Sequence, residues 1–189
     1  MQDKPVILSV RPLAQSRLFR IEELHLRFSN GEERRYERLA GVAGAVLVVP
    51  VAGDELLLVR EYAAGTERYE LGFPKGRIDP GETPEATANR ELQEEIGMAA
   101  ERIERLRTVT VAPGYFGHRT HLMLARGLRP SRLDGDEPEA IELVRWPVAA
   151  AGALLERDDF TEARSIAALF LALRRLGIPM STGDLAHVE

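Results

Sequence analysis

The hydrophobic pattern divides the chain into a strand-rich region followed by a helical one. Polar and apolar residues partly alternate over 21–28, and residues 34–39 would form the partner strand. The Asn30-Gly31 pair between the two runs is the strongest short-range signal for a β-hairpin. The apolar run 43–51 predicts a buried strand. Further strands are expected at 55–62, 103–112, 120–124 and 142–146.

One helix is expected from about Pro84 to Ile96. Thr83 supplies a hydroxyl N-cap, and the proline that follows suits the first helical position. Gly97 follows the last turn, where a left-handed backbone conformation is favourable for glycine. These signals place both ends of the helix.

The last third of the chain predicts two more helices. A short one is expected over 149–155, and a longer one over 160–176, where apolar residues recur at helical spacing until Gly177. Strands and helices together predict an α+β fold, in which helices sandwich a mixed sheet and an extra β-hairpin lies at the N-terminus.

Composition narrows the class of protein. The chain has 189 residues, 44% of them hydrophobic, which is enough for one sizeable domain with an elaboration. There is no cysteine, so disulfides, zinc ribbons and a cysteine nucleophile are excluded. The net charge of −5 argues against a nucleic-acid groove, and no run approaches the ~18 apolar residues of a membrane span. With no signal-peptide pattern at the start, a cytoplasmic enzyme with no membrane partner is expected.

The helix 84–96 carries an unusual cluster of acidic residues. At about 100° per residue, Glu94 and Glu95 lie within roughly 60° of Glu91, on either side of it. Carboxylates this close repel one another and destabilise a helix. A solvated acidic face is the common explanation of such a run, and a bound cation is the chemical alternative.

The residues around the cluster decide between the two. Five residues separate Gly76 from Glu82, and seven more separate Glu82 from Arg90. Residues 90–98 then read RELQEEIGM. Ordinary residue frequencies give this pattern a chance on the order of 10⁻⁹ per start position. The segment resembles the Nudix box at each of its fixed positions.

The resemblance implies an α/β/α sandwich and a hydrolase that acts on a diphosphate bond of a nucleoside diphosphate joined to another group. Water would attack phosphorus with the help of bound Mg²⁺ or Mn²⁺, the hard ions that oxygen ligands favour. The implied metal ligands are Glu91, Glu94 and Glu95, with a backbone carbonyl of Lys75 or Gly76. Arg90 would hold the glutamates in place through ion pairs.

A narrower resemblance is to the ADP compounds hydrolases of the NudE group, in the ADP-ribose pyrophosphatase branch. It rests on segments along most of the chain: 16–19, 60–63, 65–67, 69–73, 136–139, 145–147 and 162–164. It implies a small-molecule nucleotide substrate such as ADP-ribose, NADH or a diadenosine polyphosphate, with release of AMP or ADP. It also implies a homodimer, in which an N-terminal extension (1–42) serves dimerisation and the nucleotide pocket of a hydrolase domain (43–189).

Residues outside the box would select the substrate. Pro113 lies sixteen residues after Gly97, where the branch has a functional proline, and Tyr115 follows it. In the acidic loop 133–139, Glu137 or Glu139 would serve as a base or a further metal ligand, with Glu139 preferred for its place beside the next strand. The remaining candidates for substrate contacts are Arg17, Arg60, Arg68 and Glu70.

The sequence also departs from the ADP-ribose branch. The loop before the box has Pro74-Lys75-Gly76 instead of Pro-Ala-Gly, and Ala63 replaces the arginine that often follows the tyrosine. Two alternatives therefore stay open: an enzyme dedicated to diadenosine polyphosphates or NADH, and a nucleotide-sensing Nudix regulator without catalysis.

Overall fold

The structure is a computed structural model that describes residues 3–40, 44–135 and 138–179. The chain forms two compact units, which are described separately. The first comprises Met1–Gly44 with Thr110–Arg119, and the second comprises Ala45–Val109 with Thr120–Glu189. In these described ranges, no helix is long and apolar enough to cross a membrane.

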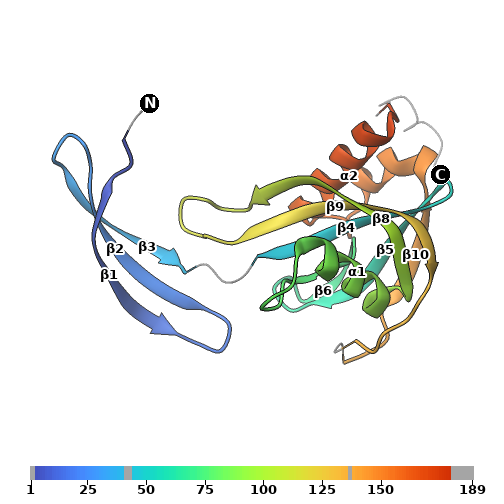
Figure 1. The fold of residues 1–189 in the computed structure, drawn as a ribbon, viewed down its shortest axis with the longest axis horizontal. Coiled ribbons are helices and arrows are strands. Elements are labelled where there is room, and N and C mark those ends of the chain that lie inside the picture. Colours follow the sequence, from blue (N-terminus) through green and yellow to red (C-terminus); the bar gives the residue numbers. More distant parts are fainter. Residues whose placement is uncertain (1–2, 41–43, 136–137, 180–189) are drawn as a thin grey trace. The chain divides into compact units, whose positions relative to one another are not determined.

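The described part of the first unit contains a three-stranded antiparallel sheet in the order β1-β2-β3 (Figure 1). The expected hairpin is present as β2 (Arg20–Arg27) and β3 (Glu33–Leu39), and Gly31 in its turn has a φ of +87°. Strand β1 (Val6–Gln15) was not expected from the sequence. Its apolar residues do not alternate regularly and it contains Pro12, which an edge strand such as β1 tolerates.

The segment 110–119 joins the end of β3. The amide of Leu39 donates to the carbonyl of Tyr115 at 2.8 Å, and Leu39 also forms a parallel bridge with Phe116. The first unit therefore combines the N-terminal sheet with a loop from later in the chain.

The second unit is built on a mixed sheet. Its main path runs β10 (Glu142–Pro147), β5 (Glu55–Ala63), β4 (Ala45–Ala52), β9 (Arg119–Pro130), β8 (Met98–Thr110). Strands β4 and β9 are parallel, whereas β5 is antiparallel to both β4 and β10. Strand β4 is buried on both faces, as its continuous apolar run predicts.

Two short strands extend this sheet. Strand β6 (Arg68–Gly72) pairs with β5, and β7 (Lys75–Arg77) pairs with β4. The sequence did not predict either, because β7 has three polar or glycine residues and β6 mixes charged and apolar positions without a clear period. Strand β7 contains Gly76, the first residue of the conspicuous motif 76–98, and β6 directly precedes it in the chain.

Helices cover both faces of the sheet, as expected for an α/β/α sandwich (Figure 1). On one face α1 (Pro84–Glu95) packs Leu92 into a core with strand residues, and Leu92 is fully buried. On the other face lie the 3₁₀ helix η1 (Val148–Glu156) and α2 (Ala163–Leu176). Helix α2 begins three residues later than expected because Glu162 caps it, accepting hydrogen bonds from the amides at 164 and 165.

Candidate metal and substrate site

Helix α1 has the ends that the sequence predicts. The amide of Ala86 donates to the Thr83 hydroxyl at 3.2 Å, and Gly97 has a φ of +68°. Since Leu92 and Ile96 are buried in the core, the rotation of the helix is fixed. That rotation turns the glutamates toward the backbone of β7 and the loop beyond it.

Arg90 connects the glutamates to that loop. Its guanidinium contacts Glu91 and Glu94 at 2.7 Å each and Glu82 at 3.0 Å. It also donates to the backbone carbonyl of Arg77 at 3.0 Å. The hydrogen bonds from Arg90 are the main cause that lowers the pKa of Glu82 to about 2. One arginine thus holds three carboxylates of the box and the end of β7.

Gly76 allows β7 to approach Glu91. A Cβ atom at position 76 would lie 1.9 Å from Oε1 of Glu91, which is far inside van der Waals contact. Only glycine can therefore occupy this position while Glu91 keeps its place.

Glu95 is the most deeply buried carboxylate of the site, with 4% of the residue exposed. Its Oε1 accepts a hydrogen bond from the backbone amide of Lys75 at 3.2 Å. Its Oε2 is buried and has no hydrogen-bond partner. Burial, the largest cause, raises the pKa of Glu95 to about 9, and the nearby charge of Glu61 adds to the shift.

These residues fit a hard divalent cation. The donors are carboxylate oxygens on the side of α1 that faces β7, and the buried Oε2 of Glu95 has no hydrogen-bond partner, which a bound cation would supply. Within the described residues, no three acidic or histidine side chains already surround one point. Arg90 draws Glu91 and Glu94 toward itself, while Glu95 turns toward Lys75.

A cavity of about 290 Å³ opens beside the helix. Glu94 and Glu95 line it from α1, and Arg132 and Glu139 line it from the segment that follows β9. The structure thus brings Glu139, expected to act near the box, to the same cavity as two box glutamates. Glu137, the other candidate from this loop, lies outside the described residues.

A second cavity of about 360 Å³ lies near Lys75. Its lining includes Glu61, Glu70 and Lys75 on the strands, and Glu162 and Arg164 at the start of α2. The Lys75 ammonium forms an ion pair with Glu61. Glu70, which we expect to contact the substrate, therefore lines the same cavity as Lys75, the residue before Gly76.

The other predicted substrate contacts lie in different surroundings. Arg68 is paired with Glu70 at 2.8 Å, beside the second cavity. Arg60 is engaged by Asp159 and by Glu142, so its charge is already compensated. The three remaining candidates belong to the first unit: Arg17, Pro113 and Tyr115.

Sequence reasoning did not find two residues of the site. Glu61 belongs to a motif that carried only the family resemblance, and Gln93 occupies a variable position inside the box. In the structure Glu61 pairs with Lys75, and Gln93 contacts the segment after β9. Each acts through a partner far away in sequence, and no local pattern predicts such pairs.

Comparison with known proteins supplies the family. Residues 42–169 match the NUDIX domain. The chain belongs to the Nudix hydrolases. Members of this family generally require a divalent metal ion, in keeping with the oxygen donors of the site. Residues 5–38 match the NudE-type Nudix hydrolase N-terminal domain, which covers the three-stranded sheet.

Individual relatives agree with this assignment. This Nudix hydrolase is 51% identical over 169 residues to the ADP compounds hydrolase NudE of Escherichia coli (strain K12), covering 89% of this chain and 91% of that protein. It is 28% identical over 152 residues to the ADP-ribose pyrophosphatase of Bacillus subtilis (strain 168), covering 79% and 80%. A crystal structure of an ADP compounds hydrolase matches with a TM-score of 0.89 and 49% identity, covering 94% of this chain and 96% of that one.

Proposed function

We propose that this Nudix hydrolase is a Mg²⁺-dependent pyrophosphohydrolase of ADP-linked compounds, namely ADP-ribose, NADH and diadenosine polyphosphates. The observation that carries the proposal is the buried Oε2 of Glu95, which has no hydrogen-bond partner and adjoins the other box glutamates. The names of the relatives, an ADP compounds hydrolase and ADP-ribose pyrophosphatases, support the substrate class.

The box glutamates would hold the metal. Glu91, Glu94 and Glu95 supply carboxylates, and the carbonyl of Lys75 or Gly76 supplies a further oxygen. When bound, Mg²⁺ or Mn²⁺ polarises the phosphoryl oxygens and lowers the pKa of the attacking water.

The chain's own residues prepare this site. Arg90 holds Glu91 and Glu94 by ion pairs of 2.7 Å, so that neither carboxylate swings into solvent. The backbone amide of Lys75 holds the third carboxylate, that of Glu95, by a hydrogen bond. Preorganised side chains cost less free energy to order when substrate binds.

The reaction is a substitution at phosphorus with water as the nucleophile. The water oxygen forms a bond to phosphorus, the anhydride P–O bond breaks, and AMP or ADP is released with the second phosphorylated product. Glu139 is the candidate that accepts the proton of water, because it lines the cavity with Glu94 and Glu95. Glu137 is the alternative from the same loop.

Substrate contacts follow from charge and position. In the second unit, Lys75 offers a point charge to phosphate, and Arg68 with Glu70 offers a polar pair beside the second cavity. We also assign contacts to Arg60 and, from the first unit, to Arg17, Pro113 and Tyr115.

We further propose that the protein is a cytoplasmic homodimer. Residues 1–42 would serve dimerisation and the nucleotide pocket, and residues 43–189 would form the hydrolase domain. Strand β1 supports the dimer because four of its apolar residues are exposed: Val6, Ile7, Val10 and Leu13. Exposed apolar residues on an edge strand favour association with another surface.

The function is tested with a substrate panel. ADP-ribose, NADH, diadenosine triphosphate and GDP-mannose are incubated with the protein and Mg²⁺, and release of AMP, ADP or GMP is measured by chromatography. We expect release from the three adenosine compounds and little from GDP-mannose. No turnover of any compound would overturn the proposal, and equal rates with GDP-mannose would overturn the adenosine preference.

Glu94→Gln and Glu95→Gln test the metal ligands. Each substitution keeps the shape of the side chain but removes a negative charge that holds the cation. We expect kcat to fall by roughly 100-fold or more, which corresponds to about 3 kcal/mol, and Mn²⁺ binding measured by electron paramagnetic resonance to weaken. Circular dichroism should show an unchanged fold. Full activity in both variants would remove these residues from the ligand set.

A further inference from the structure

The described residues between β9 and β10 are hydrogen-bonded to the rest of the second unit both near the start and near the end of this segment. Near its start it is bound to helix α1. The Ser131 hydroxyl donates to the side-chain oxygen of Gln93 at 2.9 Å, and the amide of Leu133 donates to the backbone carbonyl of Gln93 at 3.2 Å. The amide of Ser131 also donates to the carbonyl of Gly97 at 3.0 Å. The start of the segment is therefore fixed to the helix that carries the box glutamates.

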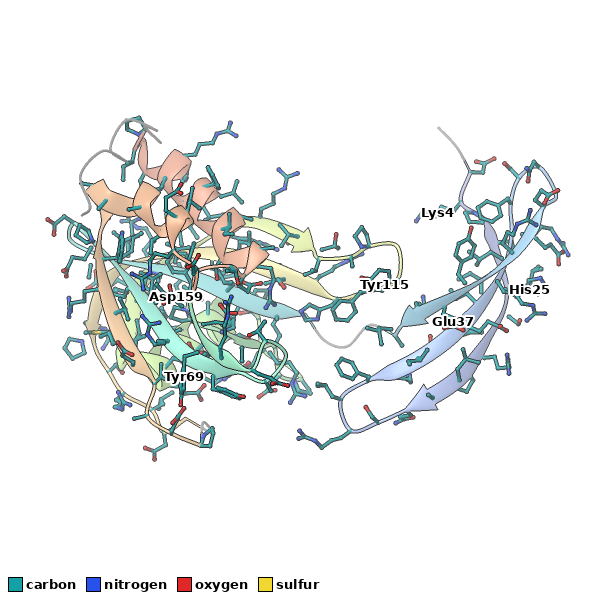
Figure 2. All side chains as sticks on the ribbon, turned by 180° about the vertical axis from the view of Figure 1, so that it is seen from behind. Lys4, His25, Glu37, Tyr69, Tyr115 and Asp159 are labelled. Atoms are coloured by element: carbon teal, nitrogen blue, oxygen red, sulfur yellow. The ribbon has the colours of Figure 1, made fainter. Side chains whose placement is uncertain are left out.

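Near the end of the segment, a side-chain hydrogen bond connects it to the sheet. The hydroxyl of Tyr69 on β6 donates to Oε1 of Glu139 at 2.7 Å. Tyr69 is labelled in Figure 2. The ring of Tyr69 is oriented by Tyr62 on β5, which contacts it edge-on with 5.5 Å between ring centroids. Consistent with this bond, Glu139 is the main cause that raises the pKa of Tyr69.

The carboxylate held in this way lines the site. Glu139 shares the cavity of about 290 Å³ with Glu94 and Glu95. Like charges repel, so an anchored hydrogen-bond donor helps to keep a third carboxylate beside two others. The phenol of Tyr69 supplies that anchor from the sheet.

We propose that Tyr69 is a positioning residue of this enzyme, whose hydroxyl holds the Glu139 carboxylate at the cavity lined by Glu94 and Glu95. The inference rests on the proposed function, in which Glu139 acts on the attacking water. Tyr69 does not contact the reacting atoms in this scheme. It sets the orientation of the carboxylate that does.

The Tyr69 side chain is suited to this role and contributes little to the core. It is 48% exposed, and its strand is held by backbone pairing with β5. Removing only the hydroxyl therefore leaves the fold and the ring contact in place. A hydrogen bond to a charged acceptor is stronger than one between neutral groups, so its loss is measurable.

The experiment compares two tyrosines that lie side by side. Tyr69→Phe should lower kcat for ADP-ribose about tenfold, with KM changed less than about twofold and the same thermal unfolding temperature. Tyr62→Phe is the matched control, because within the described residues the Tyr62 hydroxyl has no hydrogen-bond partner. It should retain wild-type kcat.

A double mutant tests whether Tyr69 acts through Glu139. On a Glu139→Gln background, Tyr69→Phe should lower kcat by much less than tenfold, since the carboxylate is already gone. An equal fall on both backgrounds, a Tyr69→Phe variant as active as Tyr62→Phe, or a Glu139→Gln variant with full kcat would each overturn the inference.

A readout without turnover separates this inference from the proposed function. With ¹³C-labelled tyrosine, the Cζ signal of Tyr69, assigned by its absence in Tyr69→Phe, reports the ionisation of the phenol. Glu139→Gln should move this titration down, toward the ordinary pKa of tyrosine. An unchanged titration would overturn the positioning role. If the contact is confirmed but no compound of the panel is hydrolysed, the proposed function fails and the contact stands.

Discussion

At the scale of single residues, the contact between Gly76 and Glu91 makes the strongest demand on the sequence. We expect Gly76→Ala to lower kcat at least about 100-fold, because the added Cβ would overlap the Glu91 carboxylate and push it from its place. Steady-state kinetics with Mg²⁺ measure the effect.

Gly65→Ala is the control for this change. A Cβ at Gly65 would meet nothing within 4 Å, and its backbone is not in the left-handed region. It should keep kcat within about twofold. If Gly76→Ala were as active as Gly65→Ala, Glu91 would not need its present position for catalysis.

The sequence predicted where the box glutamates lie in the fold because they are close together in one helix. The helical period alone brings Glu91, Glu94 and Glu95 to one face. Contacts between distant segments, such as that of Tyr69 with Glu139, depend on how strands pair. A single sequence contains no local signal for them.

At the scale of elements, Asp159 fastens the connection between η1 and α2 to strand β5 (Figure 2). Its carboxylate accepts hydrogen bonds from Arg157 and Arg60, which lower its pKa from 3.8 to about 2. The backbone carbonyl of Asp159 also accepts from the amide of Leu71 on β6 at 2.7 Å. One residue thus connects three parts of the second unit.

This pKa predicts how stability depends on pH. Because the pKa is lower in the folded state, the stabilisation is complete above about pH 4 and is lost as the pH falls through about 2. The shift corresponds to about 2 kcal/mol at neutral pH. In urea denaturation, Asp159→Asn should be less stable than the wild type by about this amount at pH 7, and the difference should shrink below about pH 4. A difference that is constant with pH would contradict the assignment.

The elements themselves were predicted unevenly. Long apolar or periodic segments, such as β4 and α2, were found because burial imposes a regular pattern on them. Strand β1 was missed because its apolar residues are exposed, so no buried face imposes a period on it. Strands β6 and β7 were missed because they are short and their pairing with β5 and β4 is a tertiary feature.

At the scale of the whole molecule, the sandwich follows from two separate apolar clusters. One includes Leu92 of α1 and the other Leu169 of α2, and both are completed by strand residues of opposite faces of the sheet. The alternation along β4 shows this division, since Val46 and Val48 belong to one cluster and Leu47 and Val49 to the other. The fold class is therefore readable from the sequence, although the strand order is not.

Assembly is the property at this scale that a mutation can test. Val10 on β1 is 47% exposed, and we expect its burial between two copies of the chain in the proposed homodimer. Val10→Glu would place a charge in that interface, where losing its hydration is costly. The variant should therefore weaken dimerisation at least about tenfold, measured as a fall from twice the monomer mass in light scattering across a dilution series.

Phe170→Glu is the control, because Phe170 is similarly exposed at 44% but belongs to α2 in the second unit. A charge at this position meets water and should leave the dimer intact. Both variants add the same charge. A difference in their dimerisation therefore reports where the interface lies and is not an effect of net charge. If both variants kept the wild-type mass at all dilutions, β1 would not form the interface. If the wild type itself had the monomer mass throughout, the homodimer would be excluded.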